Sequence, residues 1–129
     1  MNNNEFNENC KDIMKRALHY SEKARCEGLL ALEDFIDSDK KRNRDIFDYG
    51  LQFVCDGTEA ELVDKILSNI IRQEKDEQAV LLKTMQKEAV LAIQQGMNTW
   101  YLYCLLNSYT DMPAASYEEF EKNIKEAGF

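Results

Sequence analysis

The sequence predicts an all-α fold, a single domain over residues 1–129 built as a bundle of about five helices, two of them long. Strong helix formers dominate the composition, and Pro113 is the only proline. Apolar residues recur at intervals of three and four along most of the chain, which is the spacing of an amphipathic helix. A chain of this length can bury a core without disulfides or metals. The polar residues 1–5 are expected to be disordered.

The first two elements follow from this spacing. Residues 6–36 predict one long helix, and Gly28 is the point where it can bend. The stretch 38–43 is polar and charged, so it is expected to connect this helix to a second, shorter one over 46–54. Gly50 weakens the second helix without ending it, and Asp56-Gly57 closes it.

A second long helix is predicted from Thr58 to Ile93. Thr58 and Glu61 have the spacing of a capping box that opens it. Residues 72–78 are polar throughout, so this part of the helix either projects into solvent or turns back. The absence of glycine and proline there favours a continuous, projecting helix.

Two shorter helices complete the expected bundle. After Gly96, Asn98 is a plausible N-cap for a helix over 99–109. Ser116 and Glu119 form a second capping box, which predicts a last helix through Lys125. The aromatic stretch 100–103 is interpreted as core, with a partner-binding groove as the alternative.

Charge and cysteine usage exclude several classes of function. The net charge of −8 would repel a phosphate backbone, and acidic residues flank the basic cluster at 40–44, so no nucleic-acid partner is expected. The four cysteines show no paired spacing and are expected to be small buried groups in the reducing cytoplasm. The N-terminus is not expected to be a signal peptide, and the most apolar run, 100–106, is too short to span a bilayer. Direct membrane insertion is therefore not expected.

Neither a metal site nor a catalytic site is predicted. His19, the only histidine, has Glu22 and Cys26 on the same helix face, but one helix rarely supplies a closed set of metal ligands. The segment 37–48 lacks the glycine and the final glutamate of a calcium loop. No phosphate-binding loop or nucleophile motif occurs. The chain is therefore predicted to be a non-enzyme without cofactors, and a small enzyme using His19 or a cysteine is the minor alternative.

Three segments resemble the cytoplasmic portion of MotA-type flagellar stator subunits. They are 24–33 (ARCEGLLALE), 49–63 (YGLQFVCDGTEAELV) and 87–98 (KEAVLAIQQGMN), the last followed by 105–109 (LLNSY). The match covers roughly residues 15–110. The family's four transmembrane helices are missing, so the resemblance implies no ion conduction.

The resemblance implies a partner-binding role for Arg25 and Glu33, which match the family's charged pair that contacts the rotor. On one continuous helix, residues eight apart lie about 80° apart around the axis and about 12 Å along it, so both could meet one partner. The alternative is a pair of ordinary solvated charges.

The leading hypothesis is a MotA-like, membrane-free interaction protein of the flagellar motor. It would bind the rotor switch protein or full-length stator subunits, in the cytoplasm at the inner face of the membrane. The alternative is a structural or regulatory helical scaffold unrelated to torque generation. The sequence leaves homo-oligomerisation open.

Overall fold

The computed structural model describes residues 1–36 and 45–126, and all regular secondary structure in these two ranges is helical. The elements, in chain order, are α1 (Asn3–Glu27), the 3₁₀ helix η1 (Leu29–Leu32), α2 (Glu33–Ile36), α3 (Ile46–Cys55), α4 (Ala60–Arg72), α5 (Glu77–Gln94), α6 (Thr99–Asn107) and α7 (Tyr117–Glu126). The all-α prediction is confirmed. The expected count of five is wrong, because both predicted long helices are interrupted.

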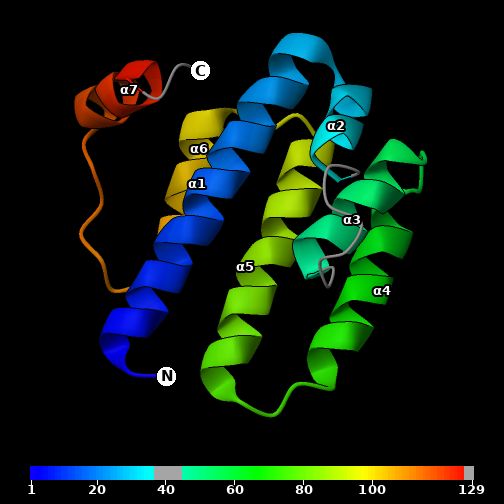
Figure 1. Cartoon of the computed structure of the whole chain (residues 1–129), viewed down its shortest axis with the longest axis horizontal. Coiled ribbons are helices and arrows are strands. Elements are labelled where there is room, and N and C mark those ends of the chain that lie inside the picture. Colours follow the sequence, from blue (N-terminus) through cyan, green and yellow to red (C-terminus); the bar gives the residue numbers. More distant parts are fainter. Residues whose placement is uncertain (37–44, 127–129) are drawn as a thin grey trace.

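Helix α5 occupies the centre of the bundle and contacts α1, α3, α4 and α6 (Figure 1). Its buried residues include Met85, Ala89 and Val90, which are fully inaccessible to solvent. Helices α3 and α4 cover one side of α5, whereas α1 and α6 cover the other. Helices α1, α3, α4 and α6 thus each bury an apolar stripe against α5, which explains why the helical spacing runs through most of the chain.

The first predicted helix ends at Gly28 instead of bending there. Gly28 has φ +92° and ψ 160°, a conformation essentially restricted to glycine, and its amide donates to Ala24 O at 2.8 Å. The chain then reverses into η1 and α2, which buries Leu32 and Ile36 in the core. Burial of these two side chains is the physical reason for the reversal.

The expected disorder of residues 1–5 is wrong for most of this segment. Helix α1 begins at Asn3, and the Asn2 side chain accepts a hydrogen bond of 2.8 Å from the Glu5 amide. This cap satisfies one amide of the first turn. Residues 3–5 are therefore helical and not disordered.

The second long helix, predicted from Thr58 to Ile93, is instead a helical hairpin. Its two helices, α4 and α5, lie side by side around a turn at 73–76 (Figure 1). Asp76 caps α5 by accepting from the Ala79 amide at 2.9 Å, and the Glu74 carboxylate accepts from the Lys75 amide and from Lys83 Nζ. Helix α4 ends with the Gln73 and Glu74 amides donating to Ile70 O and Ile71 O, and the Asp76 cap then begins α5, without glycine or proline. The expected continuous, projecting helix is therefore wrong, and the alternative, in which the polar stretch turns back, is confirmed.

The predicted start signals have mixed outcomes. Asn98 accepts from the Trp100 amide and Ser116 accepts from the Glu119 amide, so both N-caps are confirmed. The Thr58 capping box is wrong, because the N-cap of α4 is the next residue, Glu59, and no side chain caps the helix. The Thr58 amide instead donates to Phe53 O, which closes α3.

Candidate protein-binding surface

The three segments that carry the family resemblance meet at one end of the bundle, the upper end in Figure 1. One hydrogen bond joins each pair of segments. Cys55 Sγ lies 3.5 Å from Leu29 O, Gln94 Nε2 donates to Thr58 O at 2.7 Å, and Arg25 Nη1 donates to Gly96 O at 2.9 Å. We call this region, residues 24–33, 55–58 and 94–98, the glycine end.

Two turns of the glycine end have the same construction. After α3, the Gly57 amide donates to Val54 O and the Thr58 amide to Phe53 O. After α5, the Gly96 amide donates to Ile93 O and the Met97 amide to Ala92 O. This is the Schellman pattern, in which a left-handed glycine lets the chain cover the last carbonyls of a helix. The glycines of the matching segments therefore build the surface that the segments share.

Arg25 lies in the last turn of α1 and is exposed. Its hydrogen bond to Gly96 O ties the end of α1 to the turn that follows α5. This bond uses one nitrogen of a side chain that has five N–H donors, so the guanidinium can also bind a partner.

Glu33 is the first residue of α2 and is also exposed. Because Gly28 and η1 separate α1 from α2, the single-helix geometry expected for Arg25 and Glu33 is wrong. The two side chains lie on opposite sides of a chain reversal within the glycine end. Their role in binding a partner stays a prediction.

The glycine end exposes one large apolar side chain among many carboxylates. Leu30 is 67% exposed, which is more than any other large apolar side chain among those that the structure describes. The exposed acidic residues in and beside this region are Glu27, Glu33, Asp34, Asp56, Glu59 and Glu61. The glycine end therefore combines an exposed apolar contact point with an excess of negative charge.

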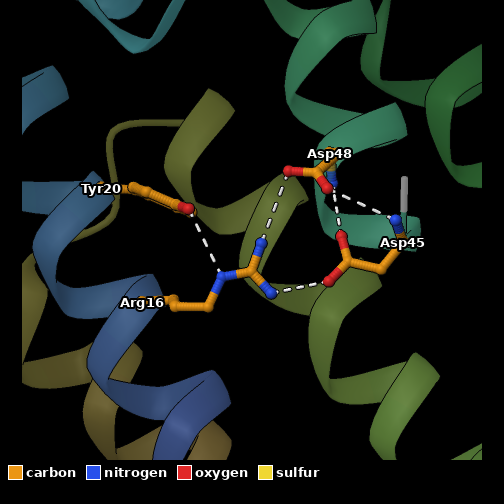
Figure 2. A network of polar contacts seen from close by, with 4 residues as sticks. All are labelled: Arg16, Tyr20, Asp45 and Asp48. Carbon is orange, nitrogen blue, oxygen red and sulfur yellow. Dashed lines mark hydrogen bonds and ion pairs between the residues drawn. The ribbon is translucent and has the colours of Figure 1, made fainter. Parts of the chain in front are cut away.

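An ion-pair network that the sequence analysis missed anchors α1 to the start of α3 (Figure 2). Arg16 Nη1 donates to Asp45 Oδ2 at 2.6 Å, and Arg16 Nη2 lies 3.5 Å from Asp48 Oδ1. The guanidinium also lies over the Phe47 ring, 4.9 Å from its centroid. Asp45 and Asp48 form a capping box that starts α3, which was the available sequence signal.

The same network sets the pKa of Asp45. Burial alone would raise this pKa, but the hydrogen bonds from Arg16 and from the Asp48 amide outweigh burial and lower it. The Asp45 carboxylate is therefore held in its charged form. The charged pair ties α1 to the start of α3.

The other candidate residues do not converge on a reactive site. Among the residues that the structure describes, no group of three or more His, Cys, Asp or Glu side chains is arranged to hold a metal ion. His19 is exposed and packs against the Phe35 ring at 4.9 Å. The basic cluster at 40–44 and most of the dismissed calcium loop lie outside the described residues.

The cysteine and aromatic expectations need correction. Cys10 is fully buried and Cys55 is half-buried, but Cys26 and Cys104 are exposed, so burial of all four cysteines was wrong. In the stretch 100–103, Leu102 is fully buried whereas Tyr101 is 64% exposed. The other two rings, Trp100 and Tyr103, are half-buried and pack against Phe120 of α7. The groove considered for a partner is thus partly covered by the chain itself.

No helix in the described ranges 1–36 and 45–126 combines the length and the apolar character needed to cross a bilayer. Comparison with known proteins gave no match to a protein-family model, a curated protein or a solved structure.

Proposed function

We propose that this chain is a protein-interaction module of the flagellar motor that binds the rotor switch protein or full-length stator subunits through its glycine end. The observation that supports the proposal is the meeting of three separate MotA-like segments at one hydrogen-bonded surface. Arg25, Leu30 and Glu33 are all exposed on this surface and therefore accessible to a partner. The module acts by binding, without conducting ions.

The contact combines charge with one apolar anchor. Arg25 and Glu33 supply opposite charges at the edge of the surface, and such charges mainly govern the association rate and the choice of partner. Leu30 supplies apolar area that is lost from water only when a partner covers it. Binding is therefore expected to weaken as salt screens the charges, and to retain a salt-resistant part that depends on Leu30.

The test measures binding of the purified chain to the rotor switch protein and to stator complexes from the same cell, by biolayer interferometry at low and high salt. Arg25→Glu and Glu33→Arg are each expected to weaken binding by roughly tenfold, about 1.4 kcal/mol, mostly through slower association. Leu30→Ser is expected to weaken binding at both salt concentrations while thermal unfolding stays unchanged, because Leu30 is exposed.

Matched controls come from exposed charges remote from the glycine end. Lys75→Glu, in the turn between α4 and α5, and Asp12→Arg, on α1, reverse the same charges without touching the proposed surface. Both are expected to bind as the unaltered chain does. If all three glycine-end variants bind both partners normally, or if neither partner binds at all, the proposal is wrong. A normal swimming phenotype after deletion would then favour a scaffold outside the motor.

A further inference from the structure

A cavity of about 990 Å³ lies between α1, the connecting segment 108–116 and α7, away from the glycine end. Figure 1 shows this segment, in orange, running beside α1 and leading to α7. The apolar side chains that line the cavity include Met14, Leu18, Tyr103, Met112, Phe120 and Ile124. Its volume is at the upper end of the range of about 300–1,000 Å³ in which small-molecule sites fall.

The charges around this cavity differ from those of the rest of the molecule. The chain has 24 acidic and 16 basic residues, yet none of the described residues that line the cavity is Asp or Glu. Lys11, Lys15, Arg16 and His19 line it from α1. Among the described lining residues the charged ones are the cations Lys11, Lys15 and Arg16, and cations beside apolar side chains favour a ligand that is both apolar and negatively charged.

Lys15 is the cation best placed to receive a ligand's negative charge. Arg16 is committed to Asp45 and Asp48, and Lys11 forms an exposed ion pair with Glu8 at 3.3 Å. Lys15 is exposed and has no ion pair or hydrogen bond within the described part of the chain. It lies four residues after Lys11 and three before Leu18, so a ligand bound here can meet charge and apolar surface on the same helix face.

We propose that this cavity binds a single-chain anionic amphiphile of the long-chain carboxylate class. The hydrocarbon chain would lie among Met14, Leu18 and Phe120, and the carboxylate would lie at Lys15 with Lys11 beside it. Residues of α1, of the connecting segment and of α7 line this cavity together, so a ligand bound here would contact all three.

Trp100 supplies a direct readout. It is the only tryptophan, and its ring stacks on Tyr103 at 5.6 Å and meets Phe120 at 5.2 Å, both of which line the cavity. Dodecanoate, added below its micelle concentration, is expected to change Trp100 fluorescence saturably at one ligand per chain. Dodecan-1-ol should bind more weakly by threefold to tenfold, roughly the contribution of one exposed ion pair, and acetate should not bind.

Three variants and one control, Lys65→Glu, test the two halves of the site. Lys15→Glu is expected to weaken dodecanoate binding by about tenfold and leave dodecan-1-ol binding unchanged, whereas Lys65→Glu on α4 should change neither. Lys15→Arg, which keeps the positive charge, should bind dodecanoate as the unaltered chain does. Ala115→Leu, which adds volume at the cavity wall, should weaken both ligands.

The proposal is overturned if dodecan-1-ol binds as tightly as dodecanoate or if Lys15→Glu leaves the preference for the carboxylate intact. It is also overturned if dodecanoate does not bind saturably, including the case in which an acidic amphipathic peptide binds at this cavity instead.

Discussion

At the scale of single residues, Arg16 connects two parts of the chain that are far apart in sequence. It donates to Asp45, 29 positions later, while its guanidinium lies between the carboxylates and the Phe47 ring. Asp48 is only 3% exposed, so its charge requires nearby donors. Removal of one member of such a network costs more free energy than loss of an exposed pair such as Lys122 with Glu126.

This network predicts how stability depends on pH. The pKa values of Asp45 and Asp64 are lowered in the folded chain, the first by Arg16 against the opposing effect of burial and the second by Lys87. A carboxyl with a lowered folded pKa stabilises the fold above its ordinary value of 3.8, and this stabilisation is lost as the pH falls through the folded value. Urea unfolding between about pH 7 and about pH 3 should therefore show a falling free energy of unfolding.

Asp45→Asn provides the matched comparison, since asparagine keeps an N-cap oxygen but has no titrating charge. The variant should be less stable at neutral pH, and its loss of stability on acidification should be smaller by about 1 kcal/mol after allowance for the partial exposure of Asp45. Equal pH dependence in both proteins would contradict the assignment of the lowered pKa to this ion pair.

At the scale of elements, Gly50 sets how closely α3 approaches α5. A Cβ atom added to Gly50 would lie 2.7 and 2.9 Å from the two methyl carbons of Val90 and 3.1 Å from Leu67 Cδ1. Val90 is fully buried and its short branched side chain has little room to move. The glycine at this position in the matching segment is thus explained by a close helix contact.

Gly50→Ala is therefore expected to lower the free energy of unfolding by about 1–2 kcal/mol, because the clash exceeds the roughly 1 kcal/mol that alanine gains in helix propensity. Chemical denaturation of four proteins, the unaltered chain, Gly50→Ala, Val90→Ala and the double variant, measures this directly. The double variant should lose less free energy of unfolding than the sum of the losses in the two single variants, because Val90→Ala removes the methyl groups that Gly50→Ala would clash with. Additive effects would show that Gly50 and Val90 are not in steric conflict.

The elements also show what the sequence could predict. Helical spacing identified nearly every helical segment, because α1, α3, α4 and α6 each bury an apolar stripe against α5, and Asn98 and Ser116 marked two starts correctly. It missed the reversal at Gly28, because residues 29–32 keep an apolar helical pattern although Leu30 is exposed. It missed the turn at 73–76 because backbone amides close α4 and the Asp76 carboxylate begins α5 there, with no glycine or proline to mark the break.

The candidate site was predictable to a similar extent. The motif indicated that Arg25 and Glu33 would be exposed, which they are, but not that Arg25 reaches Gly96, 71 positions away. The cavity beside α1 could not be predicted, because it depends on where α7 packs. Local patterns specify helices and caps, whereas these long-range contacts arise only when the helices pack together.

At the scale of the whole molecule, α7 is attached differently from the other helices. It lies at the edge of the bundle after an extended connection (Figure 1), and its main anchor is Phe120, which is 7% exposed and packs on Trp100 and Tyr103. The helices from α1 to α6 share the core around α5 and do not depend on this anchor. Alpha7 therefore has the features of a separately opening unit.

Phe120→Ala tests this arrangement. Loss of a buried phenylalanine costs about 3–5 kcal/mol in a rigid core, which exceeds what a ten-residue helix at the edge can supply to hold itself in place. Amide hydrogen exchange should therefore lose protection in α7 alone, with α1 and α5 protected as before, whereas Glu118→Ala on the exposed face should change nothing. The same variant should abolish the response of Trp100 to dodecanoate, because α7 forms one wall of the cavity. Loss of protection across all helices would instead show that α7 folds as part of the central core.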